Sequence, residues 1–319
     1  MPAQQRPQSD SNKLAPGKAG RAYGAGRFAL EFDGKGFVGV LNSADGGQFK
    51  AESIGDQVGA EGLVTRYPGR QKFEDITLQV GTTMTGEFWK WIEASINNKY
   101  ERRSGAIVAY DFDGNERARR TFREALIAEI GFPALDAKSK TPASVSVKIT
   151  PEFLEFSQSG GGGKLKAGEI AKQKHYVPSN FRVSLERFKD VTRMITKVEA
   201  LTIKQNIIVN PIGNELWPRQ EVGRIEMPTL SITLPENNIK PFMIWYQEFV
   251  GLGKHDHSRE TTGALEFLSN DLQRALMTLS FDGLGITGVT LDKHDAGADA
   301  IRMARVDMYI ENMKFEAHG

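Results

Sequence analysis

The chain has 319 residues, and its 39% hydrophobic and 25% charged content is typical of a globular protein rather than a disordered or fibrous one. Its 41 basic and 40 acidic residues give a net charge of +1, which excludes an overall field that draws the protein onto nucleic acid or an anionic membrane. The sequence contains no cysteine, which excludes disulfides, thiolate metal sites and cysteine nucleophiles.

Two segments are predicted to be flexible because their composition buries too little apolar surface to fold alone. Residues 1–26 are rich in Gln, Pro, Ser, Gly and Ala and carry a single acidic residue, Asp10, so we predict a flexible basic N-terminal arm. They lack the apolar core of a signal peptide, and no apolar run is long enough to cross a bilayer, so we expect assembly in the cytoplasm and no membrane insertion. Residues 158–178 contain the run Gly160 to Gly163, which predicts a Gly-rich linker.

The two halves that flank this linker, residues 27–157 and 179–319, repeat one succession of patterns. The segments KFEDITLQV and EMPTLSITL are followed, at the same distance, by FWKWI from residue 88 and FMIWY from residue 242. Three more pairs follow in order: GAI and GAL from residues 105 and 263, Leu135-Asp136 and Leu291-Asp292, and the closing segments 147–156 and 306–315. This common order and spacing predicts a tandem duplication in which the second domain has diverged.

Each half is expected to contain the same elements in chain order. A first strand, at residues 28–32 or 181–185, leads into a long loop or hairpin and then into a strand of alternating apolar and polar residues. One short amphipathic helix follows, at residues 86–96 or 240–250, and a hairpin and further strands close the unit. The Asp113-Gly114 pair predicts the hairpin turn of the first half.

One segment carries conflicting signals. Residues 115–130 favour a helix by intrinsic propensity, whereas their counterpart at residues 273–286 has the pattern of a strand. Because the repeat requires one structure for both, we predict strands.

A succession of motifs in the first half resembles a known family. The motifs are FALEFDG from residue 28, GGQFKAE from residue 46, RYPGRQKFEDITLQVG from residue 66, GEFWKWIEAS from residue 86, AIVAYDFDGNERARRTF from residue 106, GFPALDA from residue 131 and VKITPEFLEF from residue 147. Together they resemble the tail tube family of contractile phage tails and extracellular contractile injection systems. The second half has NPIGNELWPRQEVGRIEMP from residue 210 in place of the RYPGRQ loop and lacks the Asp-Gly hairpin, so its surface contacts are not carried over.

The resemblance implies a mainly β fold with two tandem tail-tube-like β-barrels, or orthogonal β-sandwiches, each with one flanking α-helix. The tube protein of type VI secretion is similar in fold. It also implies a structural protein rather than an enzyme, with no cofactor, which assembles into stacked rings and forms the inner tube of a phage tail or injection particle. The implied partners are further copies of the chain, sheath proteins, baseplate or spike proteins, and DNA or protein cargo in passage.

Several alternatives remain open at this point. Three chains of two units each could form a pseudo-hexameric ring, or six chains could form hexameric rings. The ring could belong to the main tube or be a specialised tube initiator, adaptor or terminator. A monomeric binding module, for a carbohydrate or a toxin, is the alternative from a different class.

Two groups of residues are candidate sites for assembly. The long loop at residues 48–71 is longer than a hairpin requires, and in the family such a loop reaches an adjacent subunit or ring. Its candidate contact residues are Arg66, Tyr67, Pro68 and Arg70. The second group is a basic cluster that could face the lumen or an interface, formed by Arg117, Arg119, Arg120 and Arg123.

Four patterns associated with ligand binding are set aside because their context is wrong. No helix follows the GxGxxG pattern from Gly34, and the glycine run before Lys164 lacks the Ser or Thr of a phosphate loop. The His-Asp-His sequence at residues 255–257 has no third metal ligand at a recognised spacing. The calcium-like start at Asp111 lacks its downstream glutamate and is better explained as a turn. We therefore predict no catalytic, cofactor-binding or metal-binding residues.

Overall fold

The structure, a computed structural model, describes residues 26–57, 64–158, 163–165, 176–210, 218–292 and 301–318. Residues 1–25 of the predicted basic arm and most of the predicted linker at residues 158–178 lie outside the described residues. Flexibility in those segments stays a prediction.

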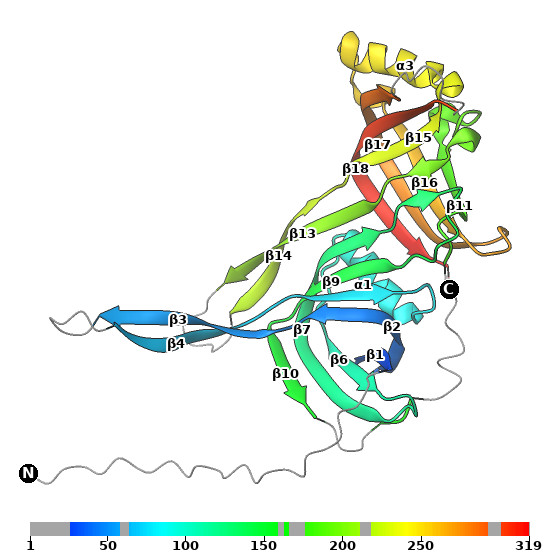
Figure 1. Cartoon of the computed structure of the whole chain (residues 1–319). Coiled ribbons are helices and arrows are strands. Elements are labelled where there is room, and N and C mark those ends of the chain that lie inside the picture. The colour runs from blue at the N-terminus through cyan, green and yellow to red at the C-terminus, as the bar shows by residue number, and fades with distance from the viewer. Residues whose placement is uncertain are drawn as a thin grey trace, which may run out of the picture.

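Six strands of the first half close into a barrel (Figure 1). In order around the barrel they are β1 (Arg27–Phe32), β2 (Gly36–Gly46), β5 (Ile76–Val80), β9 (Val145–Thr150), β7 (Glu116–Phe132) and β6 (Arg103–Tyr110). Each strand is antiparallel to the next, and β6 pairs again with β1. Closure removes the free edges on which sheets otherwise associate without control.

The alternation of residue types explains how these strands form the barrel wall. Ile76, Leu78 and Val80 are fully buried, whereas Thr77 and Gln79 between them are partly exposed. The strand prediction for residues 115–130 agrees with the structure, where β7 runs for 17 residues. Because β7 pairs with four other strands, the ladder bonds outweigh the helical propensity of its sequence.

Helix α1 (Gly86–Ile96) has the predicted bounds and packs one face onto the barrel. Phe88, Trp91 and Ile92 on that face have no exposed surface. The indole nitrogen of Trp91 donates a hydrogen bond of 2.8 Å to the carbonyl of Glu101, so this buried polar group is satisfied. Trp91 therefore holds the helix in place and also holds the segment that follows the helix.

The second half forms a curled half-barrel sheet instead of a closed one. Its strands in spatial order are β11 (Phe181–Leu185), β16 (Thr261–Leu268), β17 (Ala275–Leu291), β18 (Met303–Ala317), β15 (Leu230–Pro235) and β12 (Lys197–Val198), and β8 (Leu135–Asp136) of the first half completes the sheet. Helix α3 (Lys240–Tyr246) flanks it and continues into the π-helical turn η4 (Gln247–Gly251). Short 3-10 turns are η1 (Glu186–Phe188), η2 (Thr192–Met194), η3 (Glu236–Asn238) and η5 (His257–Arg259).

The predicted fold class is confirmed: the chain is mainly β, with a closed barrel, a half barrel and one short helix beside each among the described residues. None of the helices in those residues is long and apolar enough to span a membrane.

The two halves share strand register as well as strand order. Leu78 of β5 is opposite Val147 of β9, and Ile232 of β15 is opposite Val306 of β18, which are the pairs that the sequence repeat predicts. In β7 and in β17 the register shifts at corresponding places, after Ile127 and after Ile286. The tandem duplication stays a proposal, and these registers support it.

One predicted repeat pair does not correspond in position. Leu135 is buried in the short strand β8, which pairs with β12. Leu291 is instead the last residue of β17 and is 43% exposed. The similarity of these two dipeptides is therefore one of sequence alone.

Two β-ribbons project from the molecule towards the same side (Figure 1). The first consists of β3 (Phe49–Gln57) and β4 (Val64–Phe73), which among the described strands pair only with each other. The second consists of β13 (Leu201–Asn210) and β14 (Arg219–Glu226), and β13 also pairs with β7. The last strand of the first half, β10 (Phe153–Ser157), pairs with the other end of β7.

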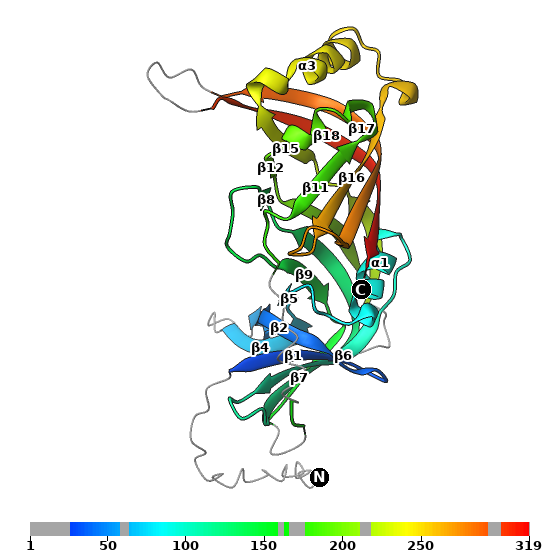
Figure 2. The same cartoon turned by 90° about the vertical axis from the view of Figure 1, so that its right-hand side faces the viewer.

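The larger of two hydrophobic core clusters runs through both halves, which lie end to end in Figure 2. The ring of Phe315 in β18 lies 6.0 Å from that of Trp89 in α1 and 5.7 Å from that of Phe132 in β7. Buried Ser95 and Gln205 exchange two hydrogen bonds across the same contact, at 3.0 and 2.9 Å. The halves are therefore packed together as one body.

Candidate assembly surfaces

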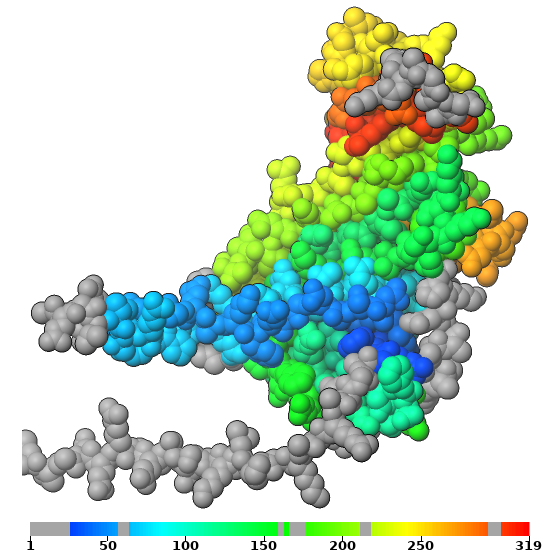
Figure 3. Space-filling view, viewed as in Figure 1, coloured from blue at the N-terminus to red at the C-terminus, as the bar shows by residue number. Residues whose placement is uncertain are grey.

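The predicted contact loop is the ribbon β3–β4, and its four candidate residues all lie on β4. Arg66, Tyr67, Pro68 and Arg70 are all exposed. Tyr67 is 50% exposed and stands opposite Ile54 of β3, which is 55% exposed. The space-filling view shows the ribbon extending away from the barrel (Figure 3). An isolated two-stranded ribbon is marginally stable in water, and exposed apolar residues on it are typical of a contact surface.

Ion pairs hold the base of this ribbon together. Lys50 pairs with Glu74, and Lys72 pairs with Glu52, so each strand contributes one cation. These residues are largely exposed, and such pairs are each worth about 1 kcal/mol or less. Ile54 and Tyr67 lie further out along the ribbon than these ion pairs.

The second ribbon, β13–β14, presents a similar surface from a different sequence. Ile208 is 45% and Val209 is 53% exposed on β13. Asn210 donates a hydrogen bond of 3.0 Å to Glu221 across the ribbon. The sequence singled out only the first ribbon, because the second lacks the family motif.

The four arginines of the predicted basic cluster have separate partners. Arg117 pairs with Asp111 at 2.6 Å, and Arg119 pairs with Glu31 at 2.7 Å and with Glu116 at 2.9 Å. The hydrogen bonds that Arg119 donates to both glutamates raise its pKa, the bond to Glu116 most strongly, which keeps its guanidinium charged. These charges are compensated within the barrel.

The other two arginines are also engaged. Arg120 donates a hydrogen bond of 2.6 Å to the carbonyl of Gly46, and the guanidinium of Arg123 lies 5.4 Å from the centre of the Phe153 ring. These contacts favour a role in holding the barrel together over a free basic surface. A lumen-facing role for the cluster stays a prediction.

The predicted Asp-Gly turn between β6 and β7 is present, and Asp111 organises it. Gly114 adopts a φ of 78°, which a glycine tolerates without strain. The Asp111 carboxylate accepts hydrogen bonds from the backbone nitrogens of Asn115 at 2.8 Å and Asp113 at 3.0 Å. The bond from Asn115, followed by the contacts of Arg117, lowers the pKa of Asp111 to about 2.

This turn should give the protein a specific acid sensitivity. Because the pKa of Asp111 is lower in the folded state, its stabilisation is complete above about pH 4, the unfolded value, and is lost as the pH falls towards 2. The difference in denaturation midpoint between the wild type and Asp111→Asn should therefore shrink from pH 6 to pH 3. Asp113→Asn, at an exposed position of the same turn, is the matched control; a difference for Asp111→Asn that is constant with pH would contradict this account.

One cluster that the sequence did not predict involves His257. Its Nδ1 atom lies 3.2 Å from Glu260 and 3.8 Å from Glu311, and the three ligand atoms lie within 4.8 Å of one another. Hydrogen bonding to Glu260 and the charges of both glutamates raise the pKa of His257. A protonated His257 would pair with both carboxylates. His255 of the same His-Asp-His sequence packs instead near the ring of Phe249.

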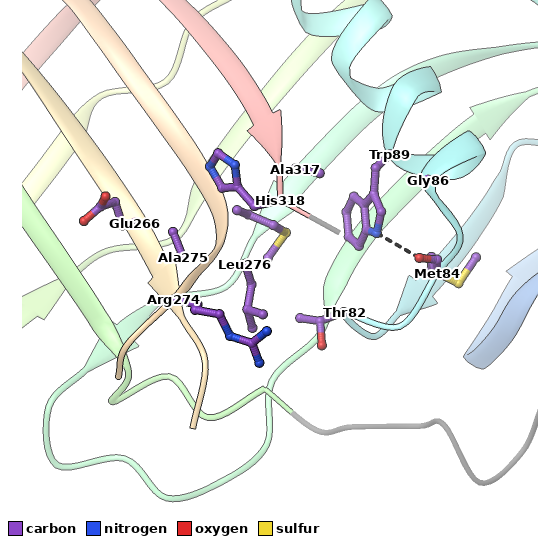
Figure 4. Close-up of a pocket in the computed structure, with 11 residues that line it drawn as sticks. Thr82, Met84, Gly86, Trp89, Glu266, Arg274, Ala275, Leu276, Ala317 and His318 are labelled. Carbon is purple, nitrogen blue, oxygen red and sulfur yellow. Dashed lines mark hydrogen bonds between the residues drawn. The ribbon is translucent and has the colours of Figure 1, made fainter. Parts of the chain in front are cut away.

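A groove of about 740 Å³ lies at the seam between the halves (Figure 4). Trp89 lines it and donates a hydrogen bond of 3.1 Å to the carbonyl of Met84. The titratable side chains in its lining include His318, which contacts Thr278 at 2.9 Å, and Glu266, which pairs with Arg182. These two groups are engaged with structural partners.

The family model described as T4-like virus tail tube protein gp19 matches residues 25–155. No curated protein matches the chain significantly. The chain is similar to a protein in the cryo-EM structure of the anti-feeding prophage tube-terminating cap, with 14% identity and a TM-score of 0.37, over 44% of this chain and 89% of that one.

Two further similarities are to proteins of an extracellular contractile injection system called PVC. For its sheath–tube complex in the extended state the identity is 14% and the TM-score 0.37, over 49% of this chain and all of that one (100%). For its sheath/tube terminator the identity is 20% and the TM-score 0.37, over 44% of this chain and 99% of that one.

Proposed function

We propose, from the match of residues 25–155 to the T4-like virus tail tube protein family, that the protein assembles into rings that form the inner tube of a contractile phage tail or injection particle. The family is structural rather than enzymatic. The tube would give a channel for DNA or effectors, and sheath and baseplate or spike proteins would be its other partners.

The observation that carries this proposal is the extent of the family match. It begins just before β1 and ends within β10, so it covers every strand of the closed barrel together with α1 and the ribbon β3–β4. A match to a single motif would not identify the fold, whereas this match includes the complete barrel. The assignment therefore applies to a whole folding unit.

The surfaces of the molecule are suited to ring assembly. Both ribbons expose apolar side chains away from the barrel, and β3 has one strand edge without a partner among the described residues. Such edges must be covered by a defined neighbour if the protein is to stay soluble. A ring of heterologous contacts covers every edge, because each subunit docks onto a different patch of the next.

We expect the apolar pair Ile54 and Tyr67 to make the main contribution of the ribbon β3–β4 to association between chains. The double substitution Ile54→Ser and Tyr67→Ser is expected to weaken assembly by about tenfold or more, because centrally placed aromatic and aliphatic contacts dominate interfaces. The thermal midpoint should change little, since both side chains are about half exposed in the single chain. Sedimentation velocity over a concentration series would measure this.

The matched control for the ribbon is the double substitution Thr65→Ala and Gln71→Ala, which removes exposed polar side chains from the same strand. It should leave association nearly unchanged. Equal weakening by both pairs would show that the apolar contact is not the cause. No change with Ile54→Ser and Tyr67→Ser would remove the ribbon from the assembly interface.

The test of the proposal as a whole is the mass of the purified full-length chain. Light scattering should show a defined oligomer whose share rises with concentration. A monomer at every concentration would overturn ring assembly and favour a monomeric binding module.

A specialised ring at one end of the tube is the second candidate function. The observation that favours it is the difference between the halves: one sheet closes, the other stays open, and their ribbons differ in sequence. A ring of two alternating units could join a three-fold structure to a six-fold tube. Negative-stain images would distinguish the candidates, because a main tube protein forms long uniform tubes and a specialised ring does not.

A further inference from the structure

The two halves of the chain are joined by edge-to-edge strand pairing. In β7, Ile130 is paired with Ile203 of β13, and Phe132 is paired with Leu201. All four of these side chains are 1% exposed. The short strands β8 and β12 continue the same seam. We call this edge of β7 the tail edge of the first half and this edge of β13 the head edge of the second half. The seam therefore joins the tail edge of one half to the head edge of the next.

Strand register identifies the counterparts of this seam at the outer ends of the chain. Val289 of β17 corresponds to Ile130 of β7, because each is opposite the matching valine of the next strand, Val306 or Val147. Phe49 of β3 corresponds to Ile203 of β13, since both ribbons shift register at matching places, after Ala51 and after Gln205.

The counterparts differ from the seam residues in exposure. Phe49 is 45% exposed, whereas its counterpart Ile203 is buried. Phe156 of β10 is 52% exposed, whereas Phe315, at the corresponding place in β18, is fully buried in the seam. Apolar residues therefore occupy these positions in both halves, and the chain itself buries those of the second half. The exposed ones in the first half form the surface that a neighbouring chain would bury.

In the part of the chain that the structure describes, the strand edges at these places also lack partners. Between Ile286 and Leu291, β17 pairs with β18 on one side, and its other side pairs with β16 only as far as Leu284. In β3 the edge away from β4 is free among the described residues. In the seam the corresponding edges of β7 and β13 are joined. Both free edges can therefore donate and accept ladder bonds.

We propose that the tail edge of β17 in one chain pairs antiparallel with the base of β3 in the next, so that Val289 lies opposite Phe49. The contact reproduces between chains the seam that joins the halves within one chain. It adds a strand pair and buries Phe49 and Phe156 against the second half of the neighbour. The occupant of this surface is therefore a second copy of the same chain, bound head to tail.

The number of chains in a ring follows if the proposed function holds. When the contact within a chain and the contact between chains are equivalent, each chain supplies two of the positions around the ring. A ring of six barrel units then contains three chains and has pseudo-six-fold symmetry. Six chains per ring would require the two halves of each chain to lie in different rings, where an edge-to-edge seam is not expected.

Cysteine cross-linking tests this register cleanly because the wild-type chain contains no cysteine. The double substitution Phe49→Cys and Val289→Cys should form disulfides between chains after mild oxidation with copper phenanthroline, since directly opposed residues of antiparallel strands have Cα atoms about 4.5–5.5 Å apart. On a non-reducing gel the cross-linked species should run up to a covalent trimer and no further, because the third bond closes the ring. Phe49→Cys with Leu272→Cys, which is exposed on the turn between β16 and β17, should not cross-link.

The outcomes separate this inference from the proposed function. Ring-shaped particles that fail to cross-link would overturn the head-to-tail register but leave ring assembly intact. A ladder that continues beyond the trimer would contradict three chains per ring. A protein that remains monomeric, and therefore cannot cross-link, would contradict the proposed function itself.

Discussion

Replacing either Trp91 or Trp245 by alanine is expected to lower the free energy of unfolding by about 3–5 kcal/mol. Both indoles are at most 1% exposed, and each donates its N–H to a carbonyl further along the chain, Trp91 to Glu101 at 2.8 Å and Trp245 to Arg259 at 3.0 Å. Alanine would leave a cavity and would also remove the hydrogen bond to that carbonyl. Because the two tryptophans occupy corresponding places, the two losses should be similar.

Denaturant unfolding followed by circular dichroism would measure both losses. The conservative variants Trp91→Phe and Trp245→Phe retain most of the packing and lose mainly the hydrogen bond, so they should cost only about 1–3 kcal/mol. A large loss at Trp91 combined with a small one at Trp245 would contradict the equivalence of the two helices.

The second large effect is expected at Phe315, in the seam between the halves. Phe315→Ala should also cost about 3–5 kcal/mol, because the ring is fully buried between Trp89 and Phe132 of the first half. Since the core is continuous, the loss should appear as one cooperative transition at a lower denaturant concentration.

Phe156→Ala provides the matched control, because Phe156 occupies the corresponding place in the first half but is 52% exposed. In the unassembled chain it should cost no more than about 1 kcal/mol, as is usual for surface positions. Two separate transitions for Phe315→Ala would show that the halves unfold independently and would contradict the shared core.

Much of the fold could be predicted because its signals are local. The helix bounds follow from the spacing of Phe88, Trp91 and Ile92, and the strand β5 follows from alternation over five residues. The strand β7 required the repeat, since its own propensity favours a helix. Comparing residues 115–130 with their counterpart in the second half supplied the evidence for a strand, which propensity alone does not contain.

The features that local patterns could not reveal depend on pairing over long distances in sequence. The sequence gives no sign that β8 leaves its own barrel to join the sheet of the second half, or that β13 extends the edge of β7. The four arginines are close in sequence, but they are spread along β7, and strand alternation places Arg120 on the face opposite Arg119, so they have separate partners. His257 precedes β16 and Glu311 lies in β18, so their approach depends on the order of the strands in the sheet.

The two sets of candidate assembly residues differ in what the structure adds to them. On the ribbon β3–β4 the structure keeps the predicted residues exposed and adds Ile54 as an apolar neighbour of Tyr67. In the basic cluster it accounts for the charges by contacts within the barrel. The ribbon is therefore the better candidate for contacts between subunits.

Cryo-EM of the purified, assembled protein viewed along its axis tests the central claim most directly. The account predicts an annulus of six barrel-shaped densities around an open channel, with two slightly different kinds alternating around the ring. A compact particle without a channel, or a ring whose densities do not resolve into barrel units, would contradict it.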